Sequence, residues 1–404
     1  MKIAILLSDL TVQGGGDRQA VYLARELQEM GHDLTVYTPA FDGGCYPDVC
    51  SRLRIVVTGK HPSAALMPSR RLRAFLDMRR MARGIEDGFD VLNPHHWPPH
   101  WAAVSAARRM ARRPAIVWMC NDPPWPPDAA RGLSPRALLR RLFFRYDSAA
   151  VQEIDRVVVL SRYAKGILDA TYGIDAAVVR SGVDIEALRL GPGGDAGEIR
   201  RRRRIPADCF LVLALGILMP HRRIEDALEA VASLLNEGRR LHLLIAGSPE
   251  QYPEYAYSLR EMARRLRITE HVTFAGAVDE NELKLYYHAC DAFLFPNENQ
   301  TWALAVIEAM ACGKPVVVSR GAAVQEVLED GKTALLVPPR DPDAIAAALR
   351  RLMDGPGLAA QVAGNGQRFV ADTFSWRRYA QSMLAIFEEH VAKGVVEAAG
   401  EKAA

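Results

Sequence analysis

The chain of 404 residues carries 51 Lys and Arg against 48 Asp and Glu, and its 49% hydrophobic content is typical of a globular protein with room for two cored domains. It holds no run of about 18 apolar residues, which excludes a membrane-spanning helix. Its opening run, MKIAILLSDL, lacks a cleavage region and predicts a strand rather than a signal peptide. The six cysteines form no C-x-x-C pair, which favours a reducing cytoplasm.

The first residues predict a βαβ unit. A strand at 2–8, a loop ending in Gly14-Gly15-Gly16, a helix at 17–30 and a strand at 33–38 follow one another. A dinucleotide fingerprint would need a third glycine where Gln19 stands, and no acidic residue ends the second strand, so NAD binding is disfavoured. The glycines allow close approach of a phosphate or sugar, or they serve only the turn.

The middle of the first half is strongly basic, with 16 Lys and Arg against 6 Asp and Glu between residues 60 and 145. Residues 70–87 predict a basic amphipathic helix that either lies on an anionic membrane or packs on its own domain. Strands with Pro-rich loops are expected at 90–104 and 115–127, and further strands at 155–161 and 176–184.

A Gly- and Asp-rich linker at 181–198 predicts a domain boundary. The arginine run 200–204 is interpreted as the exposed part of a short helix rather than as a nucleic-acid site. Beyond it strands and helices alternate, which predicts a doubly wound sheet. The strands are expected at 210–217, 241–247, 271–276, 291–296, 314–319 and 333–337, and the helices at 222–237, 254–267, 279–289, 303–312, 341–354 and 375–389, with frayed residues from 394.

The stretch 296–319, PNENQTWALAVIEAMACGKPVVVS, predicts a loop, a helix ended by Gly313 and a buried strand. Such loops follow the carboxyl ends of parallel strands, where helix N-termini bind anions, so 297–303 is a candidate site. The stretch resembles the signature of the retaining family 4 glycosyltransferases of the GT-B fold (glycosyl transferases group 1), in which a Glu, seven residues and a second Glu precede the Ala-Met-Ala-Cys-Gly run. Glu308 matches the second Glu, and Gln300 replaces the first. The segment from Gly14 to Thr38 is similar to the N-terminal motif of the same family.

The resemblance implies two Rossmann-like, doubly wound α/β domains facing a cleft, with the last helix crossing back to the first domain. We expect an acceptor-binding domain over 1–180, a nucleotide-sugar-binding domain over 181–373, and a crossover helix and tail over 374–404. The implied enzyme is a hexosyltransferase-type protein that moves a sugar, with retention, from a UDP- or GDP-sugar to a hydroxyl of a glycan, lipid-linked glycan or small glycoconjugate. It implies neither metal nor cofactor, because cationic side chains and helix N-termini stabilise the diphosphate.

For the donor, the resemblance places the diphosphate at the glycine loop and Arg222, the base at backbone atoms of 277–278, the sugar at 300–303 and the ribose hydroxyls at Glu308. One family cation is missing, because Ile217 stands in its place. Gln300 keeps hydrogen bonding without charge, and Glu298 is a candidate to supply that charge. The implied donor-binding residues are Gly15, Gly16, Arg222, Ala277, Val278, Gln300, Thr301, Trp302, Ala303 and Glu308.

For the reaction, the resemblance places His95 near the reacting centre, so that His95 and Gln300 are the catalytic candidates. The implied acceptor-binding residues are His96, Trp97, Asn121 and Asp122. A metal site at the histidines 95, 96 and 100 is disfavoured, because two prolines interrupt the ligand spacing. The tryptophans at 97, 101, 118 and 125 either stack on sugar or fill a core.

Two other functions stay open. Ile217 and Gln300 would also suit a degenerate protein that binds a sugar nucleotide without turnover, and a GT-B sugar-nucleotide epimerase would need no acceptor. The expected partners are a sugar nucleotide and a sugar or lipid-linked acceptor, and no nucleic acid. We expect a cytoplasmic protein, with peripheral contact to the anionic inner face of the cell membrane left open.

Overall fold

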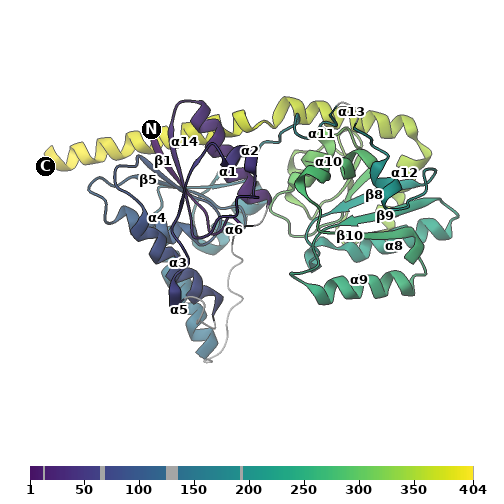
Figure 1. The fold of residues 1–404 in the computed structure, drawn as a ribbon, viewed down its shortest axis with the longest axis horizontal. Coiled ribbons are helices and arrows are strands. Elements are labelled where there is room, and N and C mark those ends of the chain that lie inside the picture. Colours follow the sequence, from purple (N-terminus) through teal and green to yellow (C-terminus); the bar gives the residue numbers. More distant parts are fainter. Residues whose placement is uncertain (12–13, 64–68, 124–134, 192–193, 404) are drawn as a thin grey trace. The chain divides into compact units, whose positions relative to one another are not determined.

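A computed structural model describes residues 1–11, 14–63, 69–123, 135–191 and 194–403 (Figure 1). The chain forms two compact units, one of Met1–Gly182 with Trp376–Ala404 and one of Val183–Ser375. Each unit holds a parallel sheet with flanking helices. The expected α/β class with two doubly wound domains is therefore confirmed. No helix within the described ranges is both long and apolar enough to cross a membrane.

The first unit is built on a seven-stranded sheet with the order β3-β2-β1-β4-β5-β6-β7. Its elements are β1 (Lys2–Leu6), α1 (Gly15–Glu29), β2 (Asp33–Thr38), α2 (Pro47–Cys50), β3 (Arg54–Val57), α3 (Arg70–Gly84), β4 (Val91–Pro94), α4 (Pro99–Ala107), β5 (Ala115–Met119), α5 (Pro135–Val151), β6 (Arg156–Val159), α6 (Arg162–Tyr172), β7 (Ala177–Val178) and α14 (Trp376–Ala403). Ile3 pairs with Leu34 on one side and Val91 on the other, so β1 is central.

The last helix, α14, belongs to the first unit, as the crossover prediction required. Tyr379 is buried and its hydroxyl accepts a hydrogen bond from Gln19 Nε2 of α1 at 2.9 Å. The rings of Trp376 and Tyr22 lie 5.1 Å apart between centroids. The helix continues to residue 403, so the expectation of a frayed end from residue 394 is wrong.

The second unit is built on a six-stranded sheet with the order β10-β9-β8-β11-β12-β13. Its elements are α7 (Glu198–Arg202), β8 (Phe210–Leu215), η2 (Pro220–Arg222), α8 (Ile224–Asn236), β9 (Leu241–Ala246), α9 (Pro253–Arg265), η3 (Thr269–His271), β10 (Val272–Gly276), α10 (Glu280–Ala289), β11 (Ala292–Phe295), α11 (Leu304–Ala311), β12 (Val316–Ser319), η4 (Ala323–Val327), β13 (Leu335–Val337), α12 (Pro342–Asp354) and α13 (Pro356–Thr373). Apolar strand residues such as Leu243 and Leu294 pack under α8 and α12 in one core cluster.

Two interpretations of basic segments are tested by packing. Met78 and Met81 of α3 are buried, so the apolar face of this helix packs on its own unit rather than lying on a membrane. The arginine run forms the short helix α7, where Arg200 pairs with Asp291 at 2.6 Å and Arg203 donates to the Tyr286 hydroxyl at 2.8 Å. Residues 201–204 of the run are exposed while Arg200 is partly buried, so the interpretation of the run as the exposed part of a short helix is confirmed.

Candidate functional site

Three neighbouring strands of the second unit end in glycines that pack backbone against backbone. The Gly216 N–H donates to the Ala246 carbonyl at 2.9 Å, and the Gly247 N–H donates to the Gly276 carbonyl at 2.7 Å. A Cβ atom on Gly247 would lie 1.9 Å from the Gly216 oxygen, so only glycine fits there. These glycines add no side chains of their own at the carboxyl edge of β8, β9 and β10, and ligands bind at this edge in open parallel sheets.

Arg222 and Gln300 meet at this edge. Arg222 lies in η2 after β8, and its Nη1 donates to Gln300 Oε1 at 3.1 Å. A Cβ atom on Gly216 would lie 3.1 Å from the Arg222 Cζ, so the guanidinium rests against the glycine edge. The Gln300 carbonyl accepts from the Ala323 N–H at 2.9 Å, which fixes the loop beyond β11. A cation and a neutral amide, 78 residues apart in sequence, thus form one polar pair.

The carboxylate of Glu298 is paired with Arg340 rather than with Arg222 or Gln300. It receives two hydrogen bonds from the Arg340 guanidinium, at 2.6 and 2.8 Å. The hydrogen bond from Arg340 lowers the pKa of Glu298. The suggestion that Glu298 supplies the charge missing at position 300 is therefore weakened, because Arg340 already neutralises it. Ile217, in the place of the family's other cation, is partly exposed.

The segment 301–303 leads directly into α11. All three of its side chains are buried, and the ring of Trp302 lies 6.1 Å from that of Phe374. Ala303 is the N-cap of α11 and has no polar side chain to occupy the first N–H groups of the helix. This segment can therefore offer a ligand main-chain N–H groups rather than side chains.

Glu308 is buried in the middle of α11, at 4% exposure. Its Oε2 accepts a hydrogen bond from the Tyr287 hydroxyl of α10 at 2.7 Å. A carboxylate buried in this apolar helix needs a partner, and the Tyr287 hydroxyl is one. Ala277 and Val278, the other donor-binding candidates of this unit, follow β10 and its Gly276.

In the first unit, Gly16, His96 and Asn121 come together at the carboxyl edge of β1, β4 and β5. A Cβ atom on Gly16 would lie 1.9 Å from His96 Cε1 and 3.0 Å from Asn121 Nδ2, so a larger residue would have to displace the His96 ring. Asn121 is buried, and neither atom of its amide has a hydrogen-bond partner among the described residues. A buried amide without a partner is costly, so this side chain is suited to a ligand that both donates and accepts. Gly15 is exposed at the start of α1.

The pKa values of the two adjacent histidines are shifted in opposite directions. His95 is fully buried, its Nε2 lies 2.8 Å from Asn93 Oδ1, and burial lowers its pKa well below 6.5, so its ring is neutral. His96 Nε2 lies 3.6 Å from Asp17 Oδ1. Burial opposes protonation of His96, but the carboxylates of Asp17 and Asp122 outweigh it and raise its pKa. Within the described part of the chain no group of three His, Cys, Asp or Glu residues is arranged to hold a metal ion.

A single buried carboxylate, Asp147 of α5, holds the segment that follows these histidines. Its Oδ1 accepts from Trp97 Nε1 at 3.0 Å and Trp101 Nε1 at 2.7 Å, and lies 3.0 Å from His100 Nε2. The Tyr172 hydroxyl donates to its Oδ2. Burial alone would raise the pKa of Asp147, but these donors outweigh burial and lower the pKa.

The tryptophans were expected either to stack on sugar or to fill a core, and burial favours the core for two of them. Trp101 and Trp118 are buried. Trp97 is partly buried, with its indole N–H on Asp147, and Trp125 lies outside the described residues.

Asp147→Asn is expected to lower the free energy of unfolding by about 3 kcal/mol, because an amide offers one oxygen and an unwanted donor to this cluster. The lowered pKa means that this stabilisation is present above the unfolded-state pKa, about 3.9, and is lost as the pH falls through the native value. Urea unfolding between pH 7 and 3 measures both effects. Asp169→Asn, on the exposed face of α6, is the matched control. A loss no larger than that of the control would contradict the role of Asp147.

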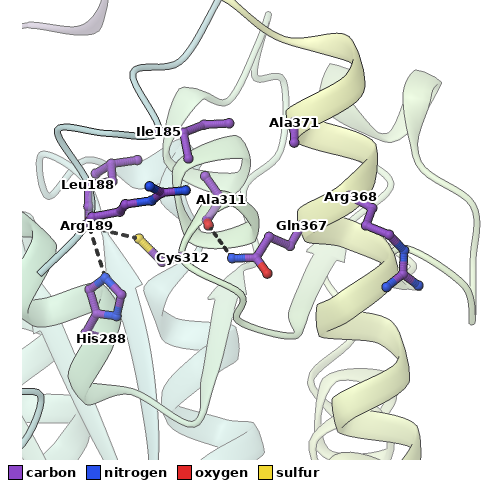
Figure 2. A pocket seen from close by; sticks show the side chains of 9 residues that line it. All are labelled: Ile185, Leu188, Arg189, His288, Ala311, Cys312, Gln367, Arg368 and Ala371. Carbon is purple, nitrogen blue, oxygen red and sulfur yellow. Dashed lines mark hydrogen bonds between the residues drawn. The ribbon is translucent and has the colours of Figure 1, made fainter.

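A cavity of about 350 Å³ lies elsewhere in the second unit (Figure 2). It is lined by Leu188, Arg189, Cys312 and Gln367 among others, near the carboxyl end of α11. Two hydrogen bonds hold its wall, since the Leu188 carbonyl faces His288 Nε2 and Gln367 Nε2 donates to the Ala311 carbonyl, both at 2.9 Å. The donor candidates lie at the other end of this helix, so this cavity is not the candidate site.

Several residues that build the site were not identified from the sequence. Asp17 had a signal, because it follows the glycine loop directly within the first turn of α1. Asp147 and Tyr287 had none, since each acts on residues more than twenty positions away.

Two family models match the chain, one over each half. The model described as Glycosyltransferase Family 4 matches residues 13–187, and the model described as Glycosyl transferases group 1 matches residues 195–369.

Similar proteins agree with these models. A D-inositol 3-phosphate glycosyltransferase of Streptomyces bingchenggensis is 28% identical over 397 residues, covering 93% of this chain and 85% of the relative. One of Kineococcus radiotolerans is also 28% identical, over 94% of this chain and 91% of the relative. Among solved structures, sucrose-phosphate synthase of Thermosynechococcus elongatus has a TM-score of 0.77 at 22% identity, covering 97% of this chain and 99% of that one. Anabaena HepE, in complex with UDP and glucose, has a TM-score of 0.77 at 18% identity, covering 96% and 99%.

Proposed function

The chain belongs to the family 4 glycosyltransferases of the GT-B fold, and on that premise we propose that it moves a sugar, with retention, from a UDP- or GDP-sugar to a hydroxyl acceptor. The acceptor class is a glycan, a lipid-linked glycan or a small glycoconjugate. The second unit binds the donor, and residues of the first unit contact the acceptor and the reacting centre.

The contact of Arg222 with Gln300 at the glycine edge carries the proposal. A guanidinium near the start of α11, where no side chain caps the first main-chain N–H groups, fits a diphosphate, because charge-assisted hydrogen bonds to phosphate are strong. Gln300 is neutral, so it holds Arg222 in place without cancelling the charge that the diphosphate needs. Glu308 lies in α11, the helix that follows this loop, and would accept hydrogen bonds from the ribose hydroxyls. The UDP bound to the structurally similar HepE supports this class of ligand.

The first unit would supply hydrogen bonds rather than a strong base. Neutral His95 is assigned to the donor sugar beside the reacting carbon, and His96, Asn121 and Asp122 to the acceptor. Trp97 is also assigned to the acceptor. Its indole N–H already donates to Asp147, so only the rest of its ring would contact the acceptor.

In the proposed reaction, the bond between the anomeric carbon and the diphosphate oxygen breaks while the acceptor oxygen bonds to that carbon on the same face. The departing phosphate oxygen takes the acceptor's proton. Arg222 and the N–H groups at 301–304 stabilise the charge on the diphosphate, so activity is proposed not to need a metal ion.

The test is a panel of UDP-, GDP- and ADP-sugars measured by thermal shift, followed by nucleoside diphosphate release with candidate acceptors. One donor should raise the melting temperature by mass action, and release should require an acceptor and persist in EDTA. Tight donor binding without turnover over a broad acceptor panel would favour a binding protein instead. A changed sugar nucleotide without any acceptor would favour an epimerase. No stabilisation by any donor would contradict the donor site itself.

A further inference from the structure

The cavity of about 350 Å³ beside the carboxyl end of α11 has no part in the proposed sugar transfer. Its volume suits a small organic molecule, since such ligands occupy pockets of roughly 300–1,000 Å³. Ile185 and Leu188 line one side of it, Ala311 and Cys312 lie at the end of α11, and Ala371 of α13 lines the other side (Figure 2). Burial raises the pKa of the Cys312 thiol to about 12, so the thiol is neutral and behaves as a small apolar group. These side chains favour a ligand with an apolar body.

Two arginines also line the cavity, and one of them has no acidic partner there. Arg189 is paired with Glu186 at 2.9 Å, and both side chains are exposed. Arg368 donates from Nη2 to Asn365 Oδ1 at 2.7 Å, and this amide carries no charge. Of the nine residues that line the cavity in the described part of the chain, none is acidic. The cavity therefore joins an apolar wall to one unbalanced positive charge, which fits a molecule with a single anionic group.

The same two helices form the cavity and hold the buried carboxylate of Glu308. Cys312 lies one turn after Glu308, and its N–H donates to the Glu308 carbonyl at 3.0 Å. In α10, His288 lines the cavity, while the hydroxyl of the preceding residue, Tyr287, donates to the Glu308 carboxylate at 2.7 Å. A molecule in the cavity would pack against the carboxyl ends of both helices that position this carboxylate.

We propose that this cavity binds a small amphiphile with one negative charge, its apolar body against Leu188 and Ala371 and its anionic group beside Arg368. Occupancy of the cavity raises the affinity of the Glu308 site for a nucleotide, because the ligand stabilises the packing of α10 and α11 that holds Tyr287 on Glu308. The coupling is reciprocal, so a bound nucleotide strengthens binding in the cavity by the same factor. The binding is independent of the proposed sugar transfer, whereas the coupling rests on the role that the proposed function gives to Glu308.

The experiment uses two fluorescent probes, anilinonaphthalene sulfonate and phenylnaphthylamine, which has the same rings without the anionic group. The full chain should bind the sulfonate at a single site. Ala371→Phe should lower its affinity by about tenfold or more, because the added ring occupies the cavity. Arg368→Gln should lower the affinity for the sulfonate by about threefold or more and leave that for the neutral probe within about twofold.

Ala360→Phe and Arg351→Gln are the matched controls, since both residues are exposed, on α13 and α12, and neither lines the cavity. Both controls should bind the probes as the unaltered protein does, and thermal unfolding checks the fold of every variant. Failure to bind the sulfonate, or equal binding by Ala371→Phe and Ala360→Phe, would overturn the site. An equal effect of Arg368→Gln on both probes would overturn the assignment of an anionic ligand.

The coupling is measured by titrating the sulfonate with and without UDP, GDP or ADP. The nucleotide that stabilises the chain in thermal shift should raise the affinity for the sulfonate by about threefold or more, and should do so in Arg351→Gln as well. A nucleotide that binds without changing the affinity for the sulfonate would overturn the coupling alone. If no nucleotide binds, the donor site and the coupling both fail, and the loss of probe binding in Ala371→Phe would still support the cavity as a separate site.

Discussion

Arg222→Met should lower kcat/KM for the sugar-nucleotide donor by about 100-fold or more, because it removes the cation proposed to stabilise the leaving diphosphate. The side chain packs on Gly216 and touches Gln300, and methionine keeps much of that volume without charge. The affinity of this variant for the nucleoside diphosphate, measured by calorimetry, should fall as well, while its affinity for the nucleoside should not change.

Arg223→Met is the matched control for this prediction. Arg223 is adjacent in sequence, but its guanidinium bonds both oxygens of buried Asp226, at 2.6 and 3.0 Å. Its loss should cost about 2 kcal/mol of stability, since it leaves that carboxylate without a partner, and should leave diphosphate affinity within about threefold. If both variants lose affinity equally, or if Arg222→Met binds diphosphate as the unaltered protein does, the assignment of Arg222 is wrong.

Glu308→Ala should raise the donor KM by about 100-fold or more, with a smaller change in kcat. Two hydrogen bonds from ribose hydroxyls to a buried carboxylate are worth about 1.5–3 kcal/mol each, and they are made in the ground state as well as the transition state. Steady-state kinetics with the identified donor measures this. Glu308→Gln keeps an acceptor for the Tyr287 hydroxyl, so its donor KM should lie between those of the unaltered protein and the alanine variant.

Deoxy nucleotides separate a ribose contact from a loss of packing at position 308. The unaltered protein should prefer the nucleoside diphosphate over its 2′- and 3′-deoxy forms, and Glu308→Ala should lose most of that preference. Tyr287→Phe removes the internal partner of Glu308 but keeps its charge, so it should keep the preference. An alanine variant that still discriminates against the deoxy forms would refute the ribose assignment.

The regular strands and most helices could be predicted because apolar runs and glycine stops mark them. Helix α11 begins and ends within one residue of the expected 303–312. Helix α13 was not predicted, because glycines interrupt its pattern. Gly366 is one of them, and a Cβ atom there would lie 3.1 Å from the Thr333 carbonyl oxygen, so packing rather than helix propensity selects it.

Helix α5 was not predicted, although Leu138, Leu139, Leu142 and Tyr146 recur at the spacing of a helix. The arginines and the Pro-rich segment before it drew attention to charge and loops instead, and these four side chains are exposed rather than part of the core. The strand expected over 176–184 shrinks to Ala177–Val178.

For the site, the sequence predicted where candidate residues lie but not what they touch. The resemblance assigned Arg222 and Gln300 to the same sugar-nucleotide donor, one to its diphosphate and the other to its sugar. That Gln300 accepts from Arg222, that Tyr287 donates to Glu308, and that Asp147 holds the segment after the histidines all depend on how separate elements pack. Side-chain packing across loops leaves no periodic trace in a sequence.

The return of α14 to the first unit has a consequence for biosynthesis. The second unit is one continuous stretch, Val183–Ser375, whereas the first needs Trp376, Tyr379 and Phe387 to fill buried positions. On the ribosome, where segments emerge in order, the sheet of the first unit must wait with an uncovered apolar surface until the second unit has been synthesised. The part of the chain made first is therefore the part that finishes folding last.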